Sequence, residues 1–258
     1  MSRFCLTLAY DGRPYAGWQS QAGGNTIQDI LLAAMQEICP AIRSVQGSGR
    51  TDAGVSADGQ TAHFDVPEEW SMGPEEWRKA LNVKLPATIR IFNCEKVEPD
   101  FHARFSASGK RYAYRIETGD TLPPLLAGLA WHRRGVQADL LEEAAALFEG
   151  THDFRAFSAN RNDGKDADRD TERTIFRTEV AYSGDHSATI RFEGNGFLYK
   201  MVRFLVGSVV YCAEGRFPPP EIEALLQGGA DHKAPYCAPA DGLTLEKVFY
   251  TERSSSDR

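Results

Sequence analysis

The stretch Gly-Ser-Gly-Arg-Thr-Asp-Ala-Gly-Val occupies residues 47–55 and separates two segments that favour extended structure. Its glycines predict a loop with an exposed backbone, which a bulky ligand can approach closely. Arg50 and Asp52 lie two residues apart in this loop, and the segment 60–66 behind it predicts a strand that anchors it. Composition and spacing alone leave two interpretations open: a hairpin turn, or a functional site that uses the carboxylate.

Several common site patterns are absent from the sequence. The loop has neither the Gly-x-Gly-x-x-Gly spacing nor a Gly-Lys-Ser/Thr sequence, and no helix pattern begins directly after it, which excludes the usual phosphate-binding loops. The five cysteines are scattered and never spaced as Cys-x-x-Cys, which argues against a disulfide framework and a zinc site. Asp166, Asp168 and Asp170 lack the glycine and glutamate that an EF-hand loop requires. We therefore expect no metal site.

The composition is that of a globular protein with one large domain or two smaller ones. The chain has 258 residues, of which 42% are hydrophobic and 25% are charged. The first residues lack the apolar run of a signal peptide, and no apolar stretch reaches the roughly 18–20 residues of a membrane span. We expect no membrane association and a cytoplasmic location.

The first hundred or so residues show the order strand, helix, strand, helix, strand. Strands are expected over residues 3–10, 60–66 and 89–97, and helices over residues 27–39 and 74–84. Thr26 is expected to cap the first helix and Pro74 to open the second. This order is typical of an α+β domain.

The second half has a similar content of elements, although no sequence repeat relates the two halves. Helices are expected over residues 139–149, 200–212 and 220–227, a hairpin over residues 173–193, and a last strand over residues 243–251. Residues 160–174 carry dense charges of alternating sign and are expected to form a solvated, mobile loop. We expect an N-terminal α+β domain over residues 1–104 and a C-terminal α+β domain over residues 105–258.

The overall charge is acidic, but one segment is basic and aromatic. A net charge of −7 does not favour a nucleic-acid partner. Residues 101–116, by contrast, contain no acid, and their arginines, lysine, phenylalanines and tyrosines alternate. Looped or single-stranded RNA needs positive charge for its phosphates and flat rings for its bases. A strand with one solvated basic face is the alternative, and the segment alone leaves both open.

The loop at residues 47–55 resembles the Arg-Thr-Asp-x-Gly-Val motif of the TruA family of tRNA pseudouridine synthases. Further blocks match this family in the same order and span nearly the whole chain: residues 10–19, 101–107, 110–114, 195–203 and 242–245. The chain departs from the family at Ser56, where many relatives have histidine, and in the longer, more acidic loop at 160–174. Ser56 has no expected chemical role, and the loop bears on how substrate docks rather than on the reaction.

The resemblance implies that uridine is converted to pseudouridine without a cofactor or a metal. Asp52 is implied as the catalytic carboxylate, which either attacks the sugar C1′ or supports a glycal route. Arg203 would pair with Asp52 and keep its pKa low, and Tyr112 would stack on the target base and accept the C2′ proton. Arg50 would fill the space left by the extruded base. Lys110 and Arg111 are candidates for phosphate contacts, with solvent-facing charges as the alternative.

The resemblance also implies a fold of two similar α/β-sandwich-like halves, whose RRM-like sheets lie side by side with an active-site cleft between them. It implies a homodimer in which one tRNA contacts both subunits, and modification of uridines 38, 39 and 40 in the anticodon stem-loop. Alternatives are a synthase with another RNA target, an RNA-binding protein without turnover, and a glycoside or nucleoside hydrolase that uses Asp58 or Asp65 as a second carboxylate. His63 and His102 are interpreted as structural.

Overall fold

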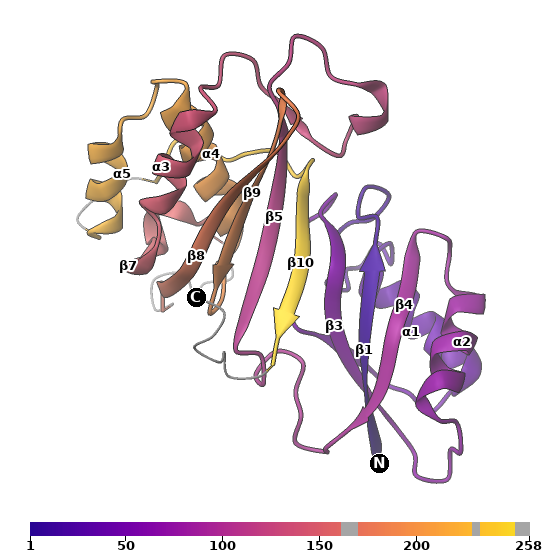
Figure 1. Cartoon of the computed structure of the whole chain (residues 1–258). Coiled ribbons are helices and arrows are strands. Elements are labelled where there is room, and N and C mark those ends of the chain that lie inside the picture. Colours follow the sequence, from indigo (N-terminus) through magenta and orange to yellow (C-terminus); the bar gives the residue numbers. More distant parts are fainter. Residues whose placement is uncertain (161–169, 229–232, 251–258) are drawn as a thin grey trace. The chain divides into compact units, whose positions relative to one another are not determined.

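The computed structural model describes residues 1–160, 170–228 and 233–250 (Figure 1). It divides into two compact units, which we call unit 1 (Met1–Ser108 and Thr244–Arg258) and unit 2 (Gly109–Leu243). The sequence predicted a single boundary after residue 104, with the last strand in the second domain. In the structure this strand groups with unit 1, because its backbone pairs with a strand of that unit.

Unit 1 contains a mixed sheet with the strand order β4-β1-β3-β10, and the short strand β2 also pairs with β3. β1 runs antiparallel to both β3 and β4, whereas β10 runs parallel to β3. The strands are β1 (Ser2–Tyr10), β2 (Val45–Gly47), β3 (Ser56–Val66), β4 (Ile89–Val97) and β10 (Leu243–Phe249). Helices α1 (Ile27–Ile38) and α2 (Pro74–Lys84) lie on the same side of this sheet (Figure 1).

Local sequence explains these helices and the sheet face they cover. The Thr26 hydroxyl accepts a hydrogen bond from the Asp29 N–H, which caps the start of α1. The fully buried Trp77 of α2 packs edge-on against Phe64 of β3, with ring centroids 5.1 Å apart, and lies near Phe4 of β1. These contacts form the apolar core of unit 1.

The opposite face of the same sheet is polar. Successive side chains along a strand point to opposite faces, and directly paired residues share a face. The strand register therefore places on this second face Arg3, Thr7, Thr61, His63 and Asp65. We call it the polar face of unit 1.

The strands of unit 2 pair in the order β5-β9-β8-β7, and β6 pairs in parallel with β5. Its strands are β5 (Gly109–Glu117), β6 (Trp131–His132), β7 (Gly150–Asp153), β8 (Glu172–Ser183) and β9 (Ser187–Gly194). Its helices are α3 (Asp139–Ala146), α4 (Met201–Ala213) and α5 (Pro219–Leu226), with short 3-10 helices η1 (Pro124–Leu126) and η2 (Phe154–Phe157). Most residues of α4 are buried, which makes this helix the centre of the unit's core.

The predicted fold class is confirmed in its content: each unit is α+β, with helices packed on a mixed sheet. The expected hairpin at residues 173–193 is present as β8 and β9. The helix expected from residue 200 begins instead at Met201, because Lys200 takes a left-handed conformation with φ of 59°. The charged loop ends earlier than expected, since β8 begins at Glu172; residues 161–169 lie outside the described part.

None of the described helices is long and apolar enough to cross a membrane.

Candidate active site

The loop that carries Asp52 runs from residue 48 to residue 55, between β2 and β3, and we call it the Asp52 loop. A second segment of unit 1, residues 12–18, lies directly against it. The Trp18 N–H donates a hydrogen bond to the Thr51 carbonyl oxygen at 3.0 Å, and the Gly54 N–H donates to the Tyr15 carbonyl oxygen at 3.3 Å. The loop is thus fastened by its backbone on both sides of Asp52.

Two glycines of the 12–18 segment make this close packing possible. A Cβ at Gly17 would lie 2.6 Å from the Thr51 carbonyl oxygen and 3.0 Å from the Asp52 carbonyl carbon. A Cβ at Gly12 would overlap the carbonyl group of Val55. Any larger residue at either position would push the Asp52 loop away from its support.

A buried polar cluster fixes the side chain next to Asp52. The Thr51 hydroxyl lies 2.8 Å from the Tyr10 hydroxyl, and the Gln60 amide donates to the Gly49 carbonyl oxygen at 2.9 Å and lies 3.4 Å from the same phenol. Tyr10, Thr51 and Gln60 are all buried. Burial raises the pKa of Tyr10 to about 12, so its phenol stays protonated near neutral pH. Thr51 is held inward, while Arg50 is exposed and Asp52 is half-buried.

Tyr112 lies on β5 of unit 2, where only 7% of the residue is exposed. Its ring packs edge-on against Phe197, with centroids 5.1 Å apart, and the strand register pairs it with Phe192. Two aromatic neighbours therefore fix the position of this ring.

Its neighbours in sequence, Lys110 and Arg111, differ in their surroundings. The Arg111 guanidinium donates through Nε and Nη2 to Oε2 of Glu193, at 2.9 Å and 2.7 Å, and this carboxylate is almost fully buried. Lys110 is half-buried on the same strand. The charge of Arg111 is thus balanced within unit 2.

Arg203 lies in the first turn of α4 and is held by the segment that follows α5. Its Nε donates to the Ala238 carbonyl oxygen at 2.7 Å, and the Ala238 N–H donates back to the Arg203 carbonyl oxygen at 2.9 Å. A Cβ at Gly207, one turn later, would overlap the Tyr236 carbonyl group, so α4 and this segment touch through their backbones. The Nε end of the guanidinium and the backbone of Arg203 are therefore both held by Ala238.

The predicted site residues are divided between the two units. Arg50 and Asp52 lie in unit 1, and the other four lie in unit 2: Lys110, Arg111, Tyr112 and Arg203. The expected pairing of Asp52 with Arg203, and the expected cleft, involve both units and stay predictions. No group of three or more metal-binding side chains occurs within the described ranges.

Sequence reasoning missed the supports of the Asp52 loop. Tyr10, Gly17 and Gln60 were not assigned a role, although Tyr10 and Gly17 lie in a block that matched the family. The match was a signal that this block matters, but no spacing rule links residue 17 to residue 51. Only the folded backbone shows that they touch.

Comparison with known proteins agrees with the motifs. Residues 7–106 and 144–251 match a family model described as tRNA pseudouridine synthase. The chain is 48% identical to a protein of Akkermansia muciniphila named tRNA pseudouridine synthase A, over 100% of this chain and 98% of that one. A protein of the same name from Syntrophotalea carbinolica is 39% identical over 97% of each chain. A solved structure titled "Crystal Structure of a Cbf5-Nop10-Gar1 Complex" superposes at a TM-score of 0.42 with 12% identity, over 95% of this chain and half of that one.

Proposed function

The chain belongs to the tRNA pseudouridine synthase family, and we propose that it isomerises uridines 38, 39 and 40 in the anticodon stem-loop of tRNA. The observation that carries this proposal is the Asp52 loop, where a carboxylate lies on a backbone fixed by Tyr10, Thr51 and Gly17. Binding RNA phosphates needs no carboxylate, whereas cleavage of a glycosidic bond uses one. A rigid support suits catalysis, because a displacement of about 1 Å can lower a rate about 100-fold.

The reaction breaks the bond between uracil N1 and the sugar C1′ and forms a bond between uracil C5 and C1′. In one route the Asp52 carboxylate attacks C1′, uracil leaves as an anion, and C5 of the rotated base then displaces the carboxylate. In the other route, which the Asp52 carboxylate would stabilise, Tyr112 accepts the C2′ proton while uracil leaves with the electron pair of the N1–C1′ bond, and a glycal forms. After C5 of the rotated base has added to C1′, the proton returns to C2′. In both routes the C5 proton is lost and N1 gains one, so the product is an isomer and no oxidant or phosphoryl donor takes part.

The remaining site residues have proposed roles that follow from their chemistry. Arg50 is exposed and long enough to occupy the space that the extruded base leaves. Arg203, whose Nε is held by Ala238, would bring positive charge to Asp52 and keep this carboxylate ionised. Lys110 and Arg111 would contact phosphates. We expect Arg111 to contribute less, because its charge is already balanced by Glu193.

We also propose a homodimer in which one tRNA contacts both subunits, and a cytoplasmic location. Both rest on membership of the family.

The decisive experiment maps pseudouridine in tRNA from cells that lack the protein and from cells that carry variants of it. Loss at positions 38–40, restored by the wild type but not by Asp52→Asn, would support the proposal. Asp52→Asn should abolish modification while tRNA binding stays within a few-fold, because the amide keeps the shape of the carboxylate but cannot act as a nucleophile.

Asp58→Asn is the matched control, because Asp58 lies six residues after Asp52 and has no role in the proposed reaction. Burial raises the pKa of the Asp58 carboxyl, the direction expected of a general acid in a nucleoside hydrolase. Full activity of Asp58→Asn is therefore expected. Release of free uracil that depends on Asp58, or modification retained by Asp52→Asn, would contradict the proposal.

A further inference from the structure

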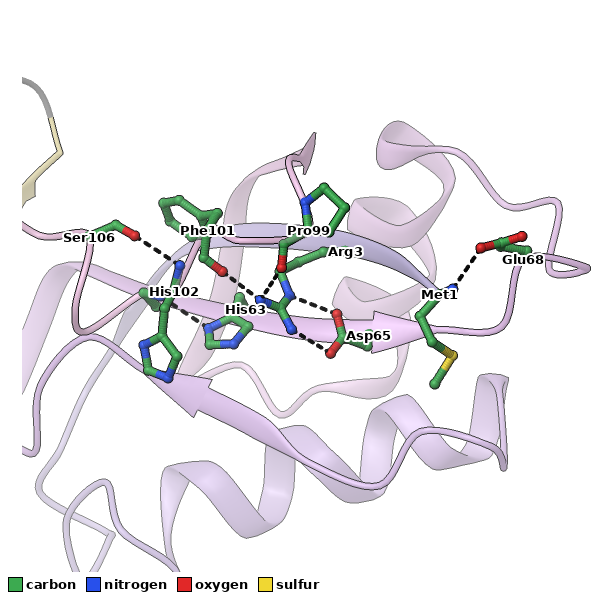
Figure 2. A network of polar contacts seen from close by, with 10 residues as sticks. Met1, Arg3, His63, Asp65, Glu68, Pro99, Phe101, His102 and Ser106 are labelled. Atoms are coloured by element: carbon green, nitrogen blue, oxygen red, sulfur yellow. Dashed lines mark hydrogen bonds and ion pairs between the residues drawn. The ribbon is translucent and has the colours of Figure 1, made fainter.

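Residues 98–106 join β4 to the start of β5 and belong to unit 1; we call them the 98–106 loop. Arg3, on the polar face of unit 1, fastens the first part of this loop (Figure 2). Its guanidinium pairs with both oxygens of Asp65 at 2.8 Å and donates to the carbonyl oxygens of Pro99, at 2.7 Å, and Phe101, at 2.8 Å. An ion pair between two adjacent strands thus fixes the loop backbone.

Two histidines fasten the next part of the loop. His63 Nδ1 accepts a hydrogen bond from the Ala103 N–H at 3.1 Å, and His102 Nδ1 accepts one from the Arg104 N–H at 3.1 Å. The His102 N–H donates to the Ser106 hydroxyl at 2.9 Å, which closes the turn (Figure 2). Both rings act as structural acceptors, in agreement with the interpretation from sequence.

The fastened turn exposes an aromatic and a basic side chain. Phe105 is 76% exposed, and its ring centroid lies 4.4 Å from that of His102 and 5.5 Å from the guanidinium carbon of Arg104. A single exposed aromatic is ordinary on a protein surface. Here, however, several hydrogen bonds already order the backbone of the turn. A ligand that binds to Phe105 and Arg104 would therefore lose little further conformational entropy in ordering this loop.

Tyr250 connects this turn to the Asp52 loop. Its phenol donates to the Ala103 carbonyl oxygen at 2.6 Å and lies beside the side chains of Ser48 and Thr61. Ser48 is the first residue of the Asp52 loop. The two loops of unit 1 therefore both adjoin one half-buried phenol, and a polymer bound at the Asp52 loop has the 98–106 loop as a close neighbour.

We propose that Arg104 and Phe105 form an RNA-contact element that receives an unpaired nucleotide of the tRNA substrate, with the base stacked on Phe105 and a phosphate bound by Arg104. This inference rests on the proposed function. An exposed flat ring beside a guanidinium matches the needs of an unstacked nucleotide, whose base has an apolar face and whose phosphate is negative. The element also supplies local positive charge to a chain whose net charge is −7.

The first test compares tRNA binding by Phe105→Ala, Phe105→Trp and Phe92→Ala, each in the Asp52→Asn background so that no turnover occurs. Phe92 is the matched control, because it is also a largely exposed phenylalanine of unit 1, on β4. Loss of one stacked base should raise Kd about 10-fold in Phe105→Ala. Phe105→Trp should bind as tightly as the parent protein, and Phe92→Ala should not change Kd.

The second test uses the salt dependence of binding to examine Arg104. Removal of one phosphate contact in Arg104→Ala should lower the slope of log Kd against log salt concentration by about one, and Arg104→Lys should preserve the slope. In the enzyme with Asp52 intact, Phe105→Ala and Arg104→Ala should raise KM and leave kcat unchanged at saturating tRNA, because neither residue touches the reacting atoms.

The outcomes separate this inference from the proposed function. If the wild type forms no pseudouridine in the same tRNA, the proposed function fails. If the wild type is active but Phe105→Ala binds tRNA as tightly as its parent, or Phe105→Trp loses as much affinity as Phe105→Ala, the RNA-contact element is wrong. A change in oligomeric mass of Phe105→Ala by light scattering, with unchanged tRNA affinity, would show that a second copy of the chain covers Phe105 and would also overturn it.

Discussion

Gly17 shows how one residue far from Asp52 in sequence sets the geometry of the site. Its φ is +93°, a conformation that side chains rarely adopt, and it lies against the backbone of Thr51 and Asp52. The adjacent Trp18 N–H donates to the Thr51 carbonyl oxygen. Both the conformation and the lack of a side chain are therefore needed to hold the Asp52 loop in place.

Gly17→Ala should lower both stability and turnover, and Gly24→Ala separates the two causes. Gly24 also has a positive φ, +67°, but a Cβ there would meet no atom within 4 Å. Both variants should lose roughly 1–2 kcal/mol of unfolding free energy to the backbone conformation. Only Gly17→Ala displaces the Asp52 loop, so its kcat should fall about 100-fold. Urea unfolding and single-turnover rates measure the two effects, and equal kcat in both variants would contradict the role of Gly17.

At the scale of elements, the sequence predicted most of the long strands and helices, left the segment that forms β5 open, and missed the short strands. Alternation of apolar and polar residues identified β1, β3 and β4, and three- to four-residue spacing identified α1 and α2. β2 and β6 contain three and two residues, too few to show any period. Their backbones pair with β3 and β5 because those longer strands are already present.

The same limit applies to the candidate site. Asp52 and Arg50 were found because a glycine-rich loop with charged residues is visible in the sequence. The support of that loop is made by backbone hydrogen bonds and by the absence of side chains at Gly12 and Gly17. Such contacts leave no pattern of residue types, so tertiary structure was needed to reveal them.

The contact between β3 and the 98–106 loop should depend on pH. Burial, together with the nearby charges of His102 and Arg3 and against the opposing effect of Asp65, lowers the pKa of His63 from 6.5 to about 4. Between pH 6.5 and about 4 the unfolded chain therefore binds a proton at this position that the folded protein does not bind. The free energy of unfolding should fall as pH falls through this window.

His63→Asn tests this expectation, since the amide oxygen can still accept the Ala103 N–H but does not titrate. Urea unfolding at pH 7.5 and at pH 5 should show a smaller loss of stability in His63→Asn than in the wild type. Some dependence should remain, because burial also lowers the pKa of His102. His186→Asn, at an exposed turn of unit 2, is the control and should follow the wild type. An unchanged pH dependence in His63→Asn would refute the assignment.

On the scale of the whole molecule, the chain leaves unit 1 after Ser108, builds unit 2, and returns to unit 1 at Thr244. The return supplies β10, which pairs with Ser56 and Ala57 directly behind the Asp52 loop. It also supplies Tyr250, whose phenol donates to the 98–106 loop and lies beside Ser48 of the Asp52 loop. Unit 1 is therefore complete only when β10 has paired with β3.

Tyr250→Phe should consequently affect rate and affinity together. The variant keeps the ring but leaves the Ala103 carbonyl oxygen without the phenol, a loss of about 1–3 kcal/mol of unfolding free energy if the group stays buried. Because both loops loosen, kcat should fall and the Kd for tRNA should rise, whereas Phe105→Ala should change affinity alone and Gly17→Ala mainly rate. Tyr182→Phe is the control, since its phenol bonds to the Ala138 carbonyl oxygen within unit 2. A Tyr250→Phe protein of lowered stability but unchanged kcat and Kd would show that the two loops are held independently.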